Sequence, residues 1–186
     1  MTQETPAEAG SPSSPRRWGT ILVWALVLGL LALLGFTLIR TQQGQVGIGD
    51  LVPDFTLTTF DGEQVAITDL RGQVVLINFW ASWCLACEEE AAELENAYQM
   101  YKDQGVVFLG VDYSDIEREA LAYLARFGIT YINGPDLGTR ISQAFRIRGV
   151  PETFVVGADG HLTSVRIGPY SSLFEIVDAI EDALGQ

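Results

Sequence analysis

The stretch Val74-Val75-Leu76-Ile77-Asn78-Phe79-Trp80, followed closely by Trp83-Cys84-Leu85-Ala86-Cys87, decides the fold of this chain. The first segment is a continuous apolar run without alternation, which is typical of a strand buried on both faces. The second segment holds the only two cysteines and opens a segment with helical periodicity. The unpaired N–H groups and the dipole of a helix N-terminus stabilise a thiolate, and two intervening residues allow the pair to close into a disulfide. The stretch therefore predicts thiol–disulfide exchange at a strand-to-helix junction.

A zinc site and a structural disulfide are the alternative interpretations of this C-x-x-C. Zinc takes about four ligands, mostly from Cys and His. The chain has two Cys and one His, His161, so a carboxylate would have to complete the set. A structural disulfide with this spacing would close almost no loop. The βα context favours redox chemistry, which needs neither a metal nor an organic cofactor.

The N-terminal part of the chain predicts a membrane anchor. Residues 1–17 are rich in Pro, Ser, Ala and Glu, which is typical of a disordered tail. Residues 18–39 form a run of 22 residues without charge, long enough to span a bilayer. The run exceeds the roughly 7–15 residues of a signal-peptide core, and no A-x-A site follows it. An uncleaved signal anchor is therefore favoured over a cleaved signal peptide.

Flanking charges predict the orientation of this anchor. Arg16 and Arg17 precede the run, whereas Arg40 is the only basic residue shortly after it. The positive-inside rule then places the tail in the cytoplasm and the remainder of the chain outside the cytosol. We expect residues 40–49 to be a linker and residues 50–186 to form one domain. The chain has 11 basic and 24 acidic residues, which argues against nucleic acid and against anionic lipid as partners.

The domain is predicted to be α/β, with a mixed central sheet flanked by helices on both faces. Asp61-Gly62 lies between two short strand-like segments, which predicts a hairpin at residues 55–58 and 64–67. Further strands are expected at residues 106–111, 129–132, 153–156 and 162–167. Helices are expected from the cysteine motif to about residue 103, from a Ser114–Glu117 capping box to Gly128, at residues 139–145, and after a Ser172–Glu175 capping box. The apolar face of the last helix is predicted to contain Leu173, Ile176, Val177, Ile180 and Leu184.

Glu90 is the third candidate residue of the site. It lies three residues after Cys87 and four before Leu94, so it shares the predicted buried face of the helix, whereas Glu89 points roughly the other way. Desolvation and a neighbouring thiolate both raise the pKa of a carboxyl group. Such a group can move the proton of Cys87 when that thiol attacks a mixed disulfide. The alternative is a solvated first-turn glutamate that only complements the helix dipole.

Three motifs together resemble the TlpA/ResA/CcmG group of thioredoxin-like proteins, which are membrane-tethered thiol–disulfide oxidoreductases. They are Gly49-x-x-Val52-Pro53-Asp54-Phe55-x-Leu57, the segment from Phe79 to Glu90, and Gly149-Val150-Pro151-Glu152-Thr153-Phe154. The resemblance covers about residues 46–186. It implies a thioredoxin-like fold with an added N-terminal β-hairpin. The chain departs from the group at Ala86 and Ala92, where the group usually has proline.

The resemblance also implies roles for individual residues. Cys84 would be the exposed nucleophile, Cys87 the resolving thiol of a redox-active disulfide, and Glu90 the active-site glutamate. Pro151, which the sequence alone reads as an ordinary trans proline at the start of a strand, would be cis and pack against the disulfide. We assign substrate contact to Trp83, Val150 and Pro151.

The function expected from this resemblance is that of an extracytoplasmic, membrane-anchored dithiol reductase. Its substrates would be protein disulfides, with the haem-site cysteines of apocytochrome c as the leading candidate, and a membrane protein of the CcdA/DsbD type would re-reduce it. A general reductase for other exported proteins is one alternative. A copper metallochaperone of similar fold is another, although such proteins typically use C-x-x-x-C with a distant histidine. A peroxidase is less favoured, because the pattern Pro-x-x-x-Thr-x-x-Cys is missing.

Overall fold

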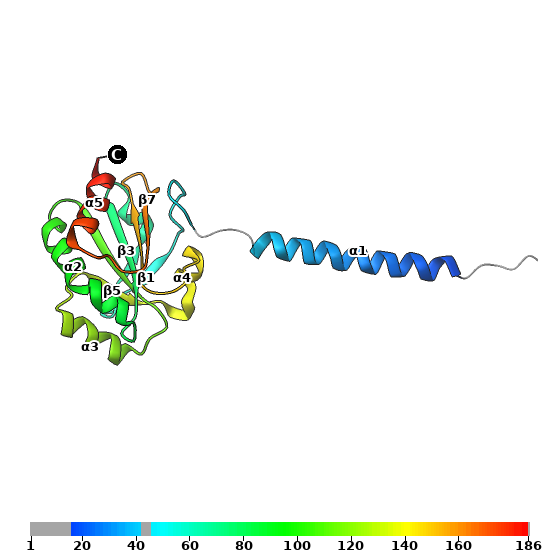
Figure 1. Ribbon diagram of the computed structural model, residues 1–186, viewed down its shortest axis with the longest axis horizontal. Coiled ribbons are helices and arrows are strands. Elements are labelled where there is room, and N and C mark those ends of the chain that lie inside the picture. Colours follow the sequence, from blue (N-terminus) through cyan, green and yellow to red (C-terminus); the bar gives the residue numbers. More distant parts are fainter. Residues whose placement is uncertain (1–15, 42–45, 186) are drawn as a thin grey trace, which may run out of the picture. The chain divides into compact units, whose positions relative to one another are not determined.

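A computed structural model describes residues 16–41 and 46–185, and the chain divides into two compact units at residues 43 and 44. The first unit contains helix α1 (Arg16–Thr41), drawn in blue in Figure 1. Its segment Trp18–Thr37 is long and apolar enough to cross a membrane. The helix presents apolar side chains all round rather than on one face, as a lipid-facing helix does. Helix α1 therefore fits a membrane anchor. The tail predicted at residues 1–17 falls almost entirely outside the described residues.

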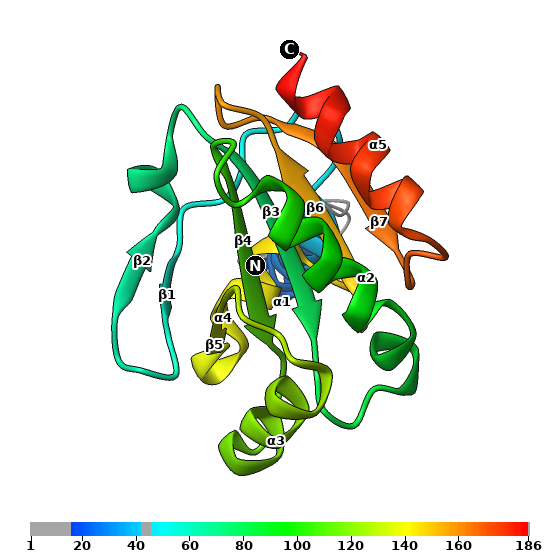
Figure 2. The ribbon, with the colours of Figure 1, turned by 90° about the vertical axis from the view of Figure 1, so that its left-hand side faces the viewer.

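The second unit is an α/β domain with one five-stranded sheet and a separate hairpin (Figure 2). The sheet has the strand order β5-β4-β3-β6-β7, in which β3, β4 and β5 run parallel and β6 and β7 pair antiparallel. This mixed sheet confirms the predicted fold class. Its strands are β3 (Val74–Trp80), β4 (Val106–Asp112), β5 (Ile132–Pro135), β6 (Glu152–Val156) and β7 (Leu162–Ile167). The hairpin pairs β1 (Thr56–Thr58) with β2 (Gln64–Ala66), and a 3-10 turn, η1 (Ile67–Leu70), follows it.

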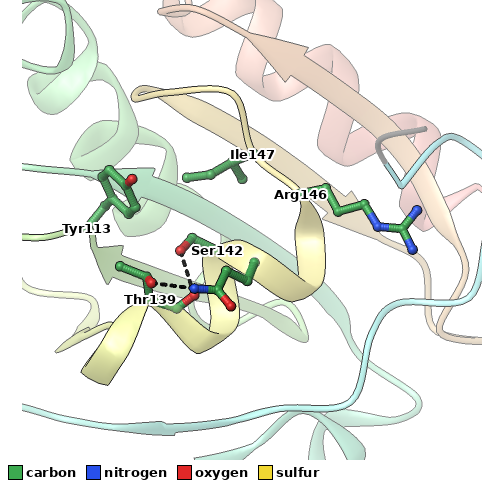
Figure 3. A pocket seen from close by; sticks show the side chains of 6 residues that line it. Tyr113, Thr139, Ser142, Arg146 and Ile147 are labelled. Carbon is green, nitrogen blue, oxygen red and sulfur yellow. Dashed lines mark hydrogen bonds between the residues drawn. The ribbon is translucent and has the colours of Figure 1, made fainter. Parts of the chain in front are cut away.

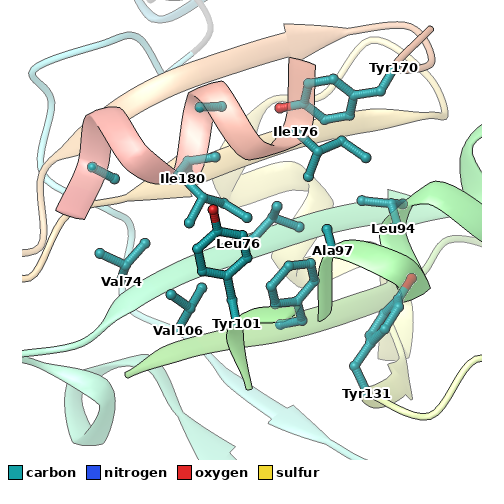
Figure 4. Packing of buried hydrophobic residues seen from close by; sticks show 14 residues of the cluster. Val74, Leu76, Leu94, Ala97, Tyr101, Val106, Tyr131, Tyr170, Ile176 and Ile180 are labelled. Atoms are coloured by element: carbon teal, nitrogen blue, oxygen red, sulfur yellow. The ribbon is translucent and has the colours of Figure 1, made fainter. Parts of the chain in front are cut away.

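Helices cover both faces of the sheet because the side chains of a strand alternate between them. Val74 and Leu76 of β3 face helices α2 (Leu85–Tyr101) and α5 (Leu173–Leu184), in the cluster drawn in Figure 4. Val75, Ile77 and Phe79 face helix α4 (Arg140–Phe145) and the hairpin instead. The sheet is thus buried on both sides, and β3 lies at its centre.

Helix α3 (Glu117–Phe127) packs at the end of β3 that leads into the cysteine motif. Its Ala120 and Tyr123 form a third buried cluster with Trp80, Cys84 and Cys87. A further short turn, η2 (Leu137–Thr139), precedes α4. The site is therefore built where the central strand ends, between α2 and α3.

Several predicted element boundaries were wrong. Strand β5 begins at Ile132, three residues later than expected. Helix α3 has Ile116 as its N-cap, without a side-chain cap, so the predicted Ser114–Glu117 capping box does not form. Ser114 instead has a positive φ of 51° in the preceding loop. The left-handed Gly128 does end α3, as predicted.

The last helix differs from its prediction in two details. Ser172 is the N-cap of α5 but its side chain makes no capping bond, and Glu175 accepts the N–H of Ser171 instead. Leu184 is 39 % exposed, so it lies outside the buried face. Ala179 and Ala183 are buried in that face because small side chains allow α5 to approach the sheet closely.

Candidate active site

The two cysteines lie at the N-terminus of α2 and form a disulfide, with their Cα atoms 5.3 Å apart. Cys84 is the N-cap residue of the helix, and its Sγ accepts the backbone N–H of Cys87 at 3.1 Å. When the disulfide is reduced, the same N–H and the helix dipole would stabilise a thiolate on Cys84. The arrangement matches the strand-to-helix junction predicted from the sequence.

The expected exposure of Cys84 is wrong in this disulfide form. Cys84 is 6 % exposed and Cys87 is 1 % exposed, so both are buried. The Sγ of Cys84 lies 3.5 Å from the carbonyl oxygen of Val150, and the side chain of Val150 packs against the same cluster. The loop that precedes β6 therefore covers the disulfide. Cys84 is still the more exposed of the two cysteines, which favours attack at Cys84.

The loop that covers the disulfide contains a cis peptide bond between Val150 and Pro151. Pro151 is buried just before β6, and the buried carboxyl of Glu152 accepts the N–H groups of Arg148 and Gly149 at 2.7 and 3.3 Å. These bonds hold the loop in place from within the sheet.

Trp83 lies on the solvent side of the cysteines. It is 58 % exposed, and its indole N–H donates to the carbonyl of Ser114 at 3.3 Å. Trp83 and Val150 therefore flank Cys84 from two different loops. Their assignment to substrate contact stays a prediction.

Glu90 is buried beneath the cysteines, on the helix face predicted from its spacing, and is 1 % exposed. Its Oε1 accepts the side-chain amide of Asn78 at 2.8 Å, and its Oε2 accepts the backbone N–H of Tyr170 at 2.8 Å. Burial raises the pKa of Glu90 to about 7, while the two hydrogen bonds and the charge of Arg166 oppose this rise. A carboxyl group with this pKa gains and loses a proton near neutral pH.

Three partners around Glu90 and Cys87 were not found from the sequence. Thr153 is fully buried, and its Oγ1 accepts a second hydrogen bond from the side-chain amide of Asn78, at 2.9 Å. The hydroxyl of Tyr123 donates to the carbonyl of Cys87 at 2.9 Å. Tyr170 acts through its backbone N–H, so no side-chain pattern could have indicated it. Thr153 had a signal, because like Asn78 it is a polar residue inside an apolar strand.

A second buried carboxyl group, Asp112, lies at the end of β4 beside Trp80. Burial is the largest cause that raises its pKa to about 7, followed by the charge of Asp115, a hydrogen bond with that residue, and the charge of Asp136. Asp115 also accepts the N–H and the hydroxyl of Ser82, at 2.5 and 2.9 Å. Asp112 is thus linked through Asp115 to the loop that precedes Cys84.

A polar pocket of about 350 Å³ lies between the end of β4 and helix α4 (Figure 3). Its lining residues do not include the cysteines or Glu90; they are Tyr113, Thr139, Ser142, Gln143, Arg146 and Ile147. Within residues 16–41 and 46–185, no group of three or more His, Cys, Asp or Glu side chains is arranged to hold a metal ion. His161 is exposed, and its ring Nδ1 is hydrogen-bonded to Oδ2 of Asp159, two residues earlier in the same turn, at 3.0 Å.

Comparisons with known proteins relate the chain to thiol–disulfide oxidoreductases. The AhpC/TSA family model matches residues 48–165. The thiol–disulfide oxidoreductase ResA of Geobacillus kaustophilus is 32 % identical over 147 residues, covering 77 % of this chain and 84 % of the relative. ResA of Geobacillus thermodenitrificans is 32 % identical over 146 residues, with the same two coverages of 77 % and 84 %. A crystal structure of a thiol:disulfide interchange protein of the thioredoxin family from Chlorobium tepidum superposes with a TM-score of 0.68 and 26 % identity, covering 75 % of this chain and 99 % of that one.

Proposed function

The chain belongs to the AhpC/TSA family and is a thiol–disulfide oxidoreductase of the ResA type, and from this premise we propose that it works as a membrane-anchored disulfide reductase outside the cytosol. The observation that carries the proposal is the position of Cys84 at the helix N-cap, with the buried Glu90 carboxyl on the same helix beneath Cys87. This arrangement supplies a stabilised nucleophile and a proton acceptor for the second thiol.

The proposed reaction begins with the reduced protein. The Cys84 thiolate attacks one sulfur of a substrate disulfide, which forms a mixed disulfide and releases the other substrate sulfur as a thiolate. Cys87 then transfers its proton to Glu90 and attacks the Sγ of Cys84. The second substrate thiolate leaves, and the Cys84–Cys87 disulfide forms. The substrate gains two electrons and the protein loses them, so an external dithiol must re-reduce the protein.

The proposed substrate contact uses the surface around Cys84. Trp83 presents an exposed aromatic face, and the backbone of Val150 and Pro151 lies next to the reacting sulfur. A polypeptide segment bound along this loop would bring its disulfide to Cys84. We assign apocytochrome c as the substrate class, and a CcdA/DsbD-type membrane protein as the electron donor, on the resemblance of the motifs alone.

The proposed topology places residues 1–17 in the cytoplasm, residues 18–39 in the membrane, and residues 50–186 outside, joined by a linker at residues 40–49. The uncharged run and the flanking Arg16 and Arg17 support this orientation. Protease added to intact spheroplasts should digest the domain, whereas protection until lysis would reverse the topology.

Trapping of the substrate tests the function. A Cys87→Ala variant keeps the nucleophile but cannot resolve the mixed disulfide, so it should accumulate a covalent complex that dithiothreitol releases. The matched control is Cys84→Ala, which should trap nothing. Identification of apocytochrome c in the complex would support the maturation pathway, and other exported proteins would support the general reductase. Equal trapping by both variants would contradict the assigned roles.

A further inference from the structure

The turn between β7 and α5 delivers the backbone N–H that contacts Glu90. Tyr170 donates this N–H to Oε2 of Glu90 at 2.8 Å. The preceding carbonyl, that of Pro169, accepts two hydrogen bonds from the guanidinium of Arg166, at 3.2 Å from Nε and 2.9 Å from Nη2. The same guanidinium lies over the ring of Tyr170, 5.5 Å from its centroid. Arg166 therefore holds both residues of the peptide that faces Glu90.

Glu175 of α5 holds the other side of this turn. Its Oε2 accepts the N–H of Ser171 at 3.1 Å and pairs with Nη2 of Arg166 at 3.3 Å. Three consecutive residues are thus fixed in alternation: the carbonyl of Pro169 by Arg166, the N–H of Tyr170 by Glu90, and the N–H of Ser171 by Glu175. The ion pair between Arg166 and Glu175 joins the two sides of the turn, and these two residues together form a clamp on the peptide.

The clamp lies near the surface, although the group that it serves is buried. The side chains of Arg166 and Glu175 are 37 % and 38 % exposed, against 1 % for Glu90. Both line a cavity of about 320 Å³ between β7 and α5. Figure 4 shows Tyr170 packed beside Ile176 in the buried cluster. Tyr170 therefore links an accessible ion pair to the interior of the site.

We propose that Arg166 and Glu175 are positioning residues for the thiol chemistry, because they hold the Tyr170 N–H against the Glu90 carboxylate and so govern when Glu90 accepts the Cys87 proton. This inference rests on the proposed reductase function and assigns it a control point outside the cysteine motif. Neither residue touches the reacting sulfurs in the proposed reaction.

The clamp can change the pKa of Glu90, because the groups around this carboxyl shift its pKa in opposite directions. Burial raises the pKa of Glu90, whereas the Tyr170 N–H, the Asn78 amide and the positive charge of Arg166 lower it, and the balance lies at about 7. Loss of one stabilising group moves this balance upward, so Glu90 would keep its proton at a higher pH. The titratable and charged groups that couple to Glu90 come from several elements; they are Arg166 of β7, Tyr170 of the turn, Tyr123 of α3 and Tyr131 before β5. Cys87 lies three residues before Glu90 on α2.

The decisive test compares Arg166→Gln with Glu175→Ala in the full-length oxidised protein. The titration of Glu90 is followed by carboxyl ¹³C NMR, with Glu90→Gln used to assign the signal. We expect Arg166→Gln to raise the midpoint by about half a pH unit or more, since both a charge and the two bonds to Pro169 are lost. If Glu175 acted only through its negative charge, Glu175→Ala would lower the titration midpoint of Glu90. The proposal predicts a raised midpoint instead, because Glu175→Ala releases Ser171 and Arg166 and so loosens the Tyr170 N–H.

The matched control is Asp178→Ala, which removes an exposed acid that lines the same cavity on the same helix. It should leave the midpoint within a tenth or so of a unit of wild type. If Arg166→Gln unfolds the protein, Arg166→Lys keeps the charge and should give a smaller upward shift. An unchanged midpoint in Arg166→Gln, or a lowered one in Glu175→Ala, overturns the inference.

A second readout separates this inference from the proposed function. The pH profile of disulfide reduction should move with the NMR midpoint in each variant. If the midpoints move as expected while wild type reduces no disulfide at any pH, the reductase function fails and the positioning role stands. If wild type is active with a midpoint near 7 that only Glu90→Gln abolishes, the function stands and the positioning role fails.

Discussion

Glu90 and Asp112, two of the buried carboxyl groups of this domain, have a similar raised pKa of about 7 in different surroundings. Both oxygens of Glu90 accept a hydrogen bond from a neutral donor. Asp112 lies among like charges, and its Oδ1 has no partner among the described residues. Burial is the largest cause in each case, but the neighbours lower the pKa of Glu90 and raise that of Asp112. Similar titration therefore does not imply similar function.

The position of each carboxyl relative to the cysteines separates them further. Glu90 lies one helical turn after Cys87 on α2, whereas Asp112 reaches the cysteine loop only through Asp115 and Ser82. We expect Glu90 to act on thiol reactivity and Asp112 to act on stability. Three substitutions can break or sharpen this division.

The largest expected effect is that of Glu90→Gln on activity. Loss of the proton acceptor should slow the resolution of mixed disulfides about 100-fold near pH 7 and remove the rise in rate with pH through that region. The rise exists in wild type because Glu90 accepts a proton only after losing its own, above its pKa of about 7. Stopped-flow reduction of a peptide disulfide across pH 5–9 measures this.

Glu89→Gln is the control for this substitution, because Glu89 is exposed on the same helix and carries the same charge. It should change the rate less than about twofold. If the two variants have similar pH profiles of reduction rate, Glu90 has only a structural role, and its proposed difference from Asp112 is contradicted.

The second effect is that of Asp112→Asn on stability. A carboxyl with a raised pKa in the folded state contributes stability that is fully present below its unfolded pKa, near 4, and is lost as the pH rises to its folded pKa, about 7. The amide does not ionise and can donate to Asp115. The free energy of unfolding of the variant, relative to that of wild type, should therefore rise by about 2 kcal/mol as the pH increases from 4 to 8. Urea unfolding at several pH values measures the difference.

Activity is the discriminating readout for Asp112→Asn. The variant should keep the wild-type rate and pH profile of disulfide reduction. A loss of rate similar to that of Glu90→Gln would give both carboxyls a role in the chemistry, and a stability difference that does not change with pH would refute the buried charge.

The smallest effect is expected from Ser82→Ala, which tests the link between Asp112 and the cysteine loop. The substitution removes the hydroxyl bond to Asp115 but keeps the backbone N–H bond. It should lower the free energy of unfolding by about 1 kcal/mol, with little change in reduction rate. A rate loss of tenfold or more would show that the Asp115 side of the site positions Cys84.

Much of the domain could be predicted from its own chain. The apolar run from Val74 to Trp80 became the central strand with the predicted bounds, and the helical spacing of Glu90 placed it on the buried face. Both predictions hold because they depend on local periodicity, which the backbone geometry converts directly into facing. The resemblance of the motifs correctly implied the cis peptide bond before Pro151, which local sequence alone did not favour.

Only the tertiary structure decided what surrounds these residues. The burial of Cys84 beneath Val150 and the bond from the Tyr170 N–H to Glu90 each join residues 66 or more positions apart. The contacts of Arg166 are local, and they reach Glu90 only through the Tyr170 bond. The capping box at Ser114 failed for the same reason, because the loop after β4 follows its contacts with Trp83 rather than its local propensity. The sequence by itself determined the chemistry and its scaffold, since periodicity and motif spacing are local. The pKa and the access of each group are set by neighbours that only the folded chain brings together.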